Sequence, residues 1–196
     1  MEVLQSSQRA WSYHPKAAQS ITLEECITEF TPIVASATNN TRKSCFFTHD
    51  LEEARKFLPN YNYLNGYLWD KSPLASKLKE EIERKFHVKF DYVLVHIYED
   101  GEANIGWHND KESLFEQIIS VTFGQTRKFR LKPIGQMKGW SDEYKLGDGD
   151  VFHMHAGCQL NFTHTVPKEL TVKGVRVNFT FRKFDLRALL YQQLSQ

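Results

Sequence analysis

The chain has 196 residues, of which 41% are hydrophobic and 25% are charged, so its length fits one globular domain with a sizeable core. The formal net charge of +1 excludes a global polycation, and any contact with nucleic acid must use a local patch. Three widely separated cysteines argue against a disulfide framework or a zinc ribbon, and no apolar run is long enough for a membrane span or a signal peptide, so we expect a soluble intracellular protein.

The first part of the chain predicts helices. Residues 1–20 are polar and show no regular period, whereas residues 21–30 read as a short amphipathic helix. A clearer helix follows Ser72-Pro73, because serine suits the N-cap and proline suits the first helical position. An apolar stripe at four-residue spacing continues this helix: Leu74, Leu78, Ile82 and Phe86. We expect this helix to lie on a sheet.

From residue 90 onward the period becomes that of strands. Short β-branched or aromatic runs occur at residues 90–98, 117–123, 128–131, 151–155, 162–166 and 175–184. Turn signals such as Gly147-Asp148-Gly149-Asp150 separate these runs, and a terminal helix is expected from Asp185. Many short strands at close spacing predict a double-sheet jelly roll or a barrel, and helices followed by strands predict an α+β architecture.

His108 and Asp110 are candidate metal ligands. Residues i and i+2 of a strand point to the same face, so these two side chains share a face, and His164 follows 56 residues after His108. Two imidazoles and one carboxylate form the set with which proteins hold Fe(II) on one face. The alternative is that each is an isolated polar residue. His153 and His155 form a second pair at this spacing, but they lack a nearby carboxylate, and we interpret them as partly buried strand residues.

Residues 176–182 alternate polar with apolar side chains. The polar side chains share one face: Arg176, Asn178, Thr180 and Arg182. One hypothesis places this face in solvent, as in many antiparallel strands. The other places it at the mouth of a barrel, where two guanidinium groups would bind a dicarboxylate. Residues 90–98 pose a similar choice for Tyr98, whose hydroxyl would either bind a carboxylate or be satisfied in the core.

Together these motifs resemble the AlkB family of Fe(II)- and 2-oxoglutarate-dependent dioxygenases, especially its nucleic-acid dealkylating members. The similarity runs from about residue 90 to residue 184, and its most specific parts are His108-Asn109-Asp110, residues 162–167 and the arginine strand at 176–182. A weaker match at residues 42–47 resembles the segment that enters the family's nucleotide-recognition lid. The resemblance implies one domain over residues 1–196. Residues 1–89 would form N-terminal helices, packed on the sheet, and a substrate-recognition segment, and residues 90–184 a double-stranded β-helix (jelly roll).

The resemblance also implies roles for individual residues, with Fe(II), 2-oxoglutarate and O2 as cofactors. Three side chains would hold the iron: His108, Asp110 and His164. Four would bind 2-oxoglutarate. Arg176 and Tyr98 would hold its distal carboxylate, and Arg182 and Asn178 would lie near the end bound at iron. His96 stands where many relatives carry an asparagine near the co-substrate, and a histidine still offers a hydrogen-bond donor there.

An alkylated base has to leave its stack to reach the iron, and aromatic side chains would hold it. Three candidates lie in one aromatic segment: Tyr61, Tyr63 and Trp69. Core packing is the alternative for these rings. A basic run, in which charges alternate with apolar residues, supplies three further candidates: Arg127, Lys128 and Arg130. This run would either track phosphates or form a solvated strand edge.

The leading hypothesis is therefore an oxidative dealkylase (demethylase) of the repair type, acting as a monomer on N-alkylated bases of DNA or RNA, with no membrane partner. A second hypothesis is a dioxygenase of the same fold that acts on a protein or a small molecule, which the near-neutral charge permits. A third is a catalytically silent jelly-roll module that binds nucleic acid. We disfavour the third because every ligand and arginine position is filled.

Overall fold

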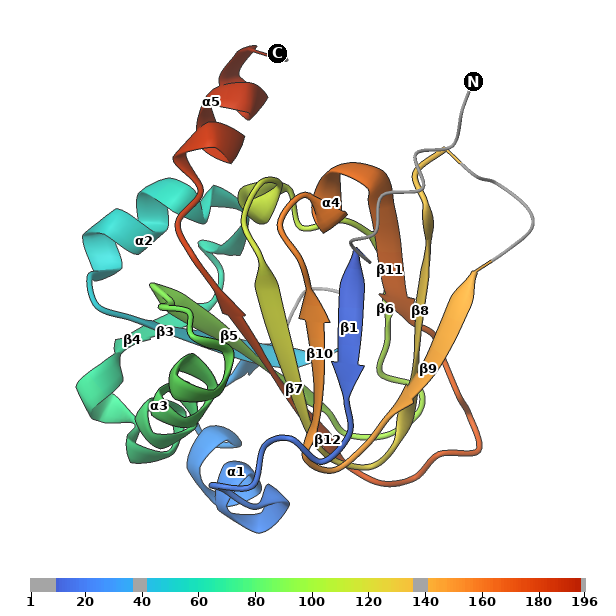
Figure 1. Cartoon of the computed structure of the whole chain (residues 1–196). Coiled ribbons are helices and arrows are strands. Elements are labelled where there is room, and N and C mark those ends of the chain that lie inside the picture. The colour runs from blue at the N-terminus through green and yellow to red at the C-terminus, as the bar shows by residue number, and fades with distance from the viewer. Residues whose placement is uncertain (1–9, 37–41, 136–140, 195–196) are drawn as a thin grey trace.

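The computed structural model describes residues 10–36, 42–135 and 141–194, and two sheets that pack face to face form its centre (Figure 1). The larger sheet has eight strands, in the order β1 (Trp11–His14), β10 (Asp150–Met154), β7 (Ile118–Gly124), β12 (Arg176–Arg182), β5 (Tyr92–Tyr98), β3 (Lys43–Thr48) and β2 (Ala35–Ser36), with β4 (Asn65–Leu68) paired to β3. The smaller sheet has four, in the order β6 (Ile105–His108), β11 (Phe162–Val166), β8 (Arg127–Pro133) and β9 (Asp142–Leu146). The α+β jelly roll predicted above is confirmed.

Two helices, α1 (Leu23–Phe30) and α3 (Pro73–Phe86), cover the outer face of the larger sheet (Figure 1). Phe30 of α1 is fully buried, and its ring centroid lies 5.4 Å from that of Phe179 on β12. Leu78 and Ile82 of α3 join the same core cluster. The remaining helices are α2 (Leu51–Phe57), α4 (Cys158–Asn161) and α5 (Leu186–Leu194), with 3-10 helices at Pro59–Tyr61, Trp69–Lys71 and Lys111–Ser113. The two helices thus pack against the face of the larger sheet that points away from the smaller sheet.

The local sequence determines where these helices begin. Ser72 accepts a hydrogen bond from the backbone N–H of Ala75 at 2.9 Å and Pro73 occupies the first turn, as the sequence predicted for α3. Thr22 and Glu25 form a reciprocal capping box at the start of α1. The predicted terminal helix is confirmed as α5, which follows Asp185.

The structure corrects several strand predictions. β1 lies within residues 1–20, which we expected to be irregular; residues 1–9 of that range lie outside the described residues. β2, β3, β4 and β9 were also not predicted, and β6 was expected only as the strand that carries His108. These strands are short or lack a regular alternation of polar and apolar residues. They form strands because of the neighbouring strands with which they pair. β3, for example, lies between β5 and β2 and is buried along most of its length.

β12 lies at the centre of the larger sheet, between β5 and β7. Its apolar side chains join the core cluster under the helices: Val177, Phe179 and Phe181. Because side chains alternate along a strand, its polar side chains point into the space between the two sheets. All seven residues are buried, so the alternative that placed the polar face in solvent is wrong.

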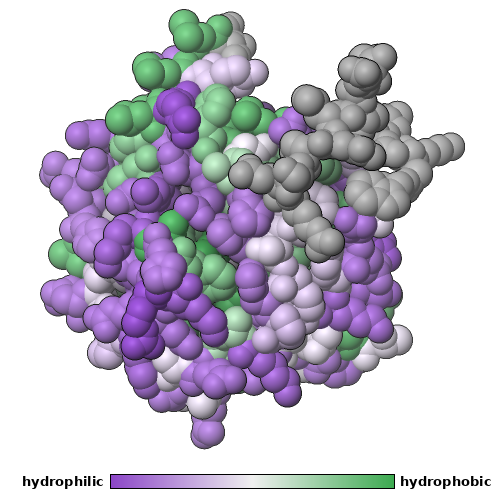
Figure 2. Space-filling view, viewed as in Figure 1, coloured by the Kyte–Doolittle hydropathy of each residue, from purple (hydrophilic) through white to green (hydrophobic). Residues whose placement is uncertain are grey.

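Figure 2 shows that the face of the molecule seen in Figure 1 is largely hydrophilic, with hydrophobic side chains gathered where α5 projects. The exposed leucines of α5 are Leu186, Leu190 and Leu194. None of the helices in the described part of the chain is long and apolar enough to cross a membrane.

Candidate metal and co-substrate site

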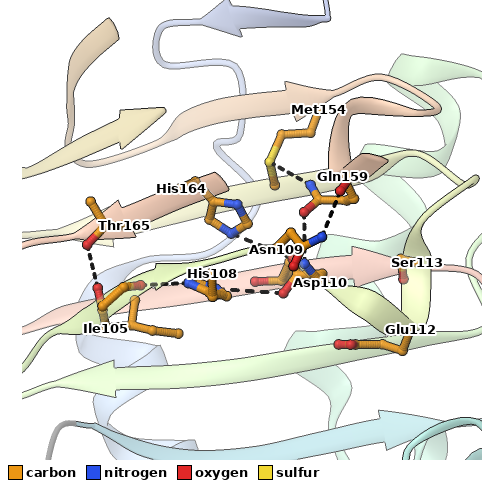
Figure 3. Close-up of polar contacts among 12 residues, drawn as sticks. Ile105, His108, Asn109, Asp110, Glu112, Ser113, Met154, Gln159, His164 and Thr165 are labelled. Carbon is orange, nitrogen blue, oxygen red and sulfur yellow. Dashed lines mark hydrogen bonds and ion pairs between the residues drawn. The ribbon is translucent and has the colours of Figure 1, made fainter. Parts of the chain in front are cut away.

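The three predicted metal ligands converge at one end of the space between the sheets (Figure 3). His108 on β6 lies directly opposite His164 on β11, and Asp110 follows in the turn after β6. One ligand atom of each residue lies within 4.8 Å of the others. Nε2 of His108 is 3.7 Å from Oδ1 of Asp110, and Nε2 of His164 is 3.6 Å from Oδ2. The strand itself ends at His108, so the turn, not strand alternation, brings Asp110 to this face.

Hydrogen bonds that involve the backbone fix the orientation of two of these ligands, His108 and Asp110 (Figure 3). Nδ1 of His108 lies 2.8 Å from the carbonyl oxygen of Gly106, which leaves Nε2 as the unprotonated nitrogen of the neutral ring. Gln159 of α4 is fully buried and accepts a hydrogen bond from the backbone N–H of Asp110 at 2.9 Å. The main-chain carbonyl oxygen of Gln159 accepts another hydrogen bond, from Nδ2 of Asn109, at 2.9 Å. Nothing in the sequence distinguishes Gln159, and our sequence reasoning missed it.

The charge state of the cluster suits a divalent cation. Burial would raise the pKa of Asp110, but its surroundings, above all the positive charge of Arg182, outweigh this effect and lower the pKa to about 2. Burial lowers the pKa of His164 to about 3. Oδ2 of Asp110 is buried and accepts no hydrogen bond from the described residues, although Nη2 of Arg182 lies 3.0 Å away. The carboxylate and the neutral imidazole are the forms that bind metal, so these side chains fit an iron ion.

Arg176 is a buried cation with unused donors in the same cavity. It is 2% exposed, and its Nη2 donates to Oγ1 of Thr122 at 2.9 Å and to Oδ1 of Asn178 at 2.5 Å. Among the described residues, Nε and Nη1 have no hydrogen-bond partner and no carboxylate pairs with this guanidinium. Burial lowers the pKa of Arg176 to about 10. The ring centroid of Tyr98 lies 5.0 Å from its guanidinium carbon, so both residues fit one end of an anionic ligand.

His96 also lines this cavity, and its ring takes part in hydrogen bonds with residues around the start of β3. Nδ1 of His96 accepts a hydrogen bond from Nε of Arg42 at 3.2 Å and lies 2.7 Å from Oγ of Ser44. Because arginine can only donate, the proton of the neutral ring is on Nε2. Burial, with the nearby Arg42 and Arg182, lowers the pKa of His96 well below its usual value. The ring is therefore neutral, with one N–H to offer.

The cavity also receives Tyr61, one of the predicted substrate residues. Its hydroxyl donates to Oε1 of Glu112 at 2.8 Å, and the same oxygen pairs with Nη1 of Arg182. Glu112 is a second residue that our sequence reasoning missed, although it lies only four positions after His108. Tyr63 is 52% exposed and does not line the cavity.

The structure corrects the expectation for Trp69. Its ring is 8% exposed and stacks on Phe47, with centroids 6.4 Å apart, in the core between the larger sheet and its helices. Nζ of Lys79 lies 5.4 Å from the same ring. Core packing, the alternative considered above, explains Trp69, and we do not assign it a substrate contact.

Arg127 is likewise a structural residue. It is 1% exposed and donates to the carbonyl oxygens of Asp100, Ala103 and Pro167, with Glu169 at 3.1 Å. The expectation of a phosphate contact is therefore corrected for Arg127. β8 is also not an edge strand, because it lies between β11 and β9. The outward-pointing Lys128 and Arg130 remain partly exposed.

The rival histidine pair lies away from the cavity. His153 on β10 has Nε2 2.7 Å from Oε1 of Gln117, and its ring packs against His155 with centroids 4.2 Å apart. Neither residue lines the cavity that contains His108 and Asp110. His153 is a strand residue, as interpreted, and is buried, whereas His155 is partly buried and lies just after the end of β10.

The family of the chain follows from comparison with known proteins. The model of the 2OG-Fe(II) oxygenase superfamily matches residues 9–182, and the chain therefore belongs to that superfamily. Its cofactors are Fe(II), 2-oxoglutarate and O2, and the His-Asp-His cluster described above is a matching donor set.

Among individual relatives, the chain is similar to proteins named as alkB homologues. It is 33% identical over 120 residues to alpha-ketoglutarate-dependent dioxygenase alkB homolog 3 of Mus musculus, covering 56% of this chain and 42% of the relative. It is 28% identical over 147 residues to DNA oxidative demethylase ALKBH2 of Arabidopsis thaliana, covering 60% and 45%. The matches thus span less than half of these two relatives. The solved structure of OsALKBH1 aligns with a TM-score of 0.66 at 15% identity, covering 91% of this chain and all of that one, and supports the fold alone.

Proposed function

We propose that this protein is an Fe(II)- and 2-oxoglutarate-dependent dioxygenase that removes N-linked alkyl groups from bases of DNA or RNA. His108, Asp110 and His164 would hold the iron through the donor atoms that lie within 4.8 Å of one another. When bound, iron and 2-oxoglutarate together supply oxidation of an alkyl C–H bond by O2, with succinate and carbon dioxide as co-products. The observation that carries the proposal is Arg176, a buried guanidinium with two unpartnered nitrogens in the same cavity as the three ligands.

The remaining polar side chains suit the co-substrate in different ways. Arg176 and Tyr98 would bind its distal carboxylate, and Arg182, which pairs with Asp110, lies near the end at the metal. Asn178 already accepts hydrogen bonds from Ser120, Thr122 and Arg176 and donates to Thr180. We therefore assign Asn178 the role of orienting Arg176, and we assign the free N–H of His96 to the ligand.

The proposed substrate class rests on the names of the relatives and on an aromatic ring that lines the cavity. The names of relatives include a DNA oxidative demethylase, and a base in a duplex has to be flipped out before its alkyl group reaches a buried metal. Tyr61 supplies an aromatic ring at this cavity. A hydroxylated N-methyl group would then leave as formaldehyde and restore the base.

The test has two readouts. Purified protein with Fe(II) should convert 2-oxoglutarate to succinate and should remove a methyl mass from oligonucleotides that carry 1-methyladenine or 3-methylcytosine. Asp110→Ala should abolish both activities, whereas Asp70→Asn, a change at an exposed carboxylate, should retain them. Normal turnover by Asp110→Ala would refute the ligand assignment. Succinate formation without demethylation of any oligonucleotide would instead favour an oxygenase of the same fold that acts on a protein or a small molecule.

A further inference from the structure

The outer face of the smaller sheet carries a row of cations. Because side chains alternate along β8, Phe129 and Leu131 point into the core between the sheets. Lys128, Arg130 and Lys132 therefore point outward, and all three are partly exposed. This face lies on the opposite side of the sheet from the metal ligand His164, which is the strand partner of Leu131.

The positive charge on this face is only partly compensated. Lys128 lies directly opposite Lys145 on β9, and like charges in that position are unfavourable unless an anion joins them. Glu169 lies 4.0 Å from Lys128, but it already pairs with the buried Arg127. Glu143 pairs with Arg130 at 2.6 Å. Among the described residues, no carboxylate pairs with Lys145. A polyanion would relieve this repulsion.

An exposed aromatic ring stands at one end of this face. Trp107 is 42% exposed, and the Nζ atom of Lys132 lies 4.5 Å from the centroid of its ring. Over the described chain, Lys132 pairs with no carboxylate either. An open ring face suits a base and an adjacent ammonium suits a phosphate, which are the two contacts that one unpaired nucleotide offers.

The position of this pair relates it to the proposed active site. Trp107 directly precedes His108, with Cα atoms about 3.8 Å apart, and the two side chains point to opposite faces of β6. β6 is an edge strand, and the adjacent Gly106 is exposed. Apart from its own backbone and its two chain neighbours, no heavy atom of the described residues lies within 4 Å of the place where a Cβ would lie. A strand whose one nucleotide enters the cavity beside His108 therefore has an open path across β6 to Trp107.

We propose that Trp107 and Lys132 form a single-strand binding site that holds a nucleotide next to the one under repair, with the base on the indole and the phosphate at the ammonium. Lys128, Arg130 and Lys145 continue this path along the outer face of the sheet. The inference rests on the proposed function and adds that the substrate strand is unpaired beside the cavity. A paired base would be unable to stack on Trp107.

The test measures binding of a single-stranded oligonucleotide of about 12 nucleotides carrying one 1-methyladenine, with 2-oxoglutarate and Mn(II) replacing Fe(II) to prevent turnover. Trp107→Ala should weaken binding about tenfold and Trp107→Phe, which retains a ring, much less. Lys132→Ala should reduce the slope of log K against log salt by about 0.7, one single-strand phosphate contact. Lys71→Ala, at an exposed lysine next to Asp70 and α3, should leave affinity and slope unchanged.

The outcomes separate this inference from the proposed function. Formation of succinate without an oligonucleotide should be the same in Lys132→Ala and the wild type, because Lys132 lies outside the cavity. If the wild type neither binds nor demethylates any oligonucleotide, the proposed function fails and this inference fails with it. If the wild type is active but both Trp107→Ala and Lys132→Ala bind and turn over normally, only the inference is overturned. Equal affinity for a duplex, with the same dependence on Trp107, would also overturn it.

Discussion

Burying Arg176 is unfavourable for the protein without its ligand. A guanidinium that is 2% exposed loses its hydration, and two of its three nitrogens gain no hydrogen bond from the described residues in return. Asp110 and Arg182 compensate each other at 3.0 Å, but Arg176 has no such counter-charge in the described chain. The co-substrate proposed above would supply this counter-charge, so the effects of Arg176 on stability and on co-substrate binding are expected to be opposite.

Arg176→Met tests this expectation. The variant keeps an apolar stem but removes the unpaired charge, so we expect the metal-loaded protein without 2-oxoglutarate to melt at or above the wild-type temperature. Loss of two charge-assisted hydrogen bonds should weaken 2-oxoglutarate binding by roughly 100-fold or more. Thermal unfolding with Mn(II), with and without 2-oxoglutarate, measures both effects. A 2-oxoglutarate-induced shift equal to that of the wild type would contradict the assignment.

His153 makes the stability of the fold depend on pH. Burial, with the adjacent His155 and His14, lowers its pKa from the usual 6.5 to about 4. Because the folded pKa is depressed, the stabilisation is present above about pH 6.5 and is lost as the pH falls towards 4, where the unfolded chain binds the proton more readily. One such proton changes the free energy of unfolding by roughly 1.4 kcal/mol per pH unit.

Urea denaturation in EDTA, at pH values between about 7 and 4.5, measures this dependence. The wild type should lose stability on acidification, and His153→Gln should lose it less steeply. His49→Gln, at an exposed histidine, should keep the wild-type slope. Identical slopes for His153→Gln and the wild type would show that His153 does not titrate in this window.

At the scale of elements, the metal cluster depends on a turn and on a helix of only four residues. β6 ends at His108, and α4 brings Gln159 against the backbone of Asp110 at 2.9 Å. The Nε2 atom of Gln159 also lies 3.2 Å from Sδ of Met154, so its amide bridges α4, β10 and the ligand turn. Gln159 is thus a positioning residue for the carboxylate.

Gln159→Leu should weaken metal binding about 10- to 100-fold, the usual effect of losing a group that orients a ligand. Titration of the protein with Co(II), followed by visible absorption, measures the affinity without requiring turnover. Asn161→Ala, which removes an exposed side-chain contact within the same helix, is the matched control and should bind Co(II) normally. An unchanged affinity in Gln159→Leu would assign this residue to folding alone.

At the scale of the whole molecule, α1 and the larger sheet share one aromatic cluster. The ring of Phe30 contacts those of Phe47 and Phe179 at centroid distances of 5.9 and 5.4 Å. Phe179 lies on β12, whose opposite face carries Arg176 and Asn178. The helix layer therefore packs against the face of β12 that is opposite Arg176 and Asn178 and supports the strand that carries them.

Phe30→Ala should reduce the free energy of unfolding by about 3–5 kcal/mol, because it leaves a cavity in this cluster. Chemical denaturation of the full chain measures the loss. Leu186→Ala, at a side chain that is 64% exposed, should change stability by less than about 0.5 kcal/mol. A small effect at Phe30 would mean that α1 does not contribute to the core as its burial indicates.

The sequence by itself determined what depends on neighbours along the chain. The caps of α1 and α3 are local hydrogen bonds, and the alternation at residues 176–182 fixes which side chains share a face, because the strand period is two. The tertiary structure decided which face is covered. A strand alternates polar and apolar side chains in the same way whether its polar face lies in solvent or lines a cavity. Only the smaller sheet, which packs opposite β12, makes the polar face of β12 an interior one.

Long-range pairing decided the rest of the site. His164 meets His108 because β11 pairs with β6, and no local rule selects that partner over a distance of 56 residues. Tertiary packing also distinguishes two residues of one aromatic segment. Tyr61 lines the cavity, whereas Trp69 packs in the core. Residue type and spacing define the chemistry that is available, and sheet order and burial determine which of those residues meet.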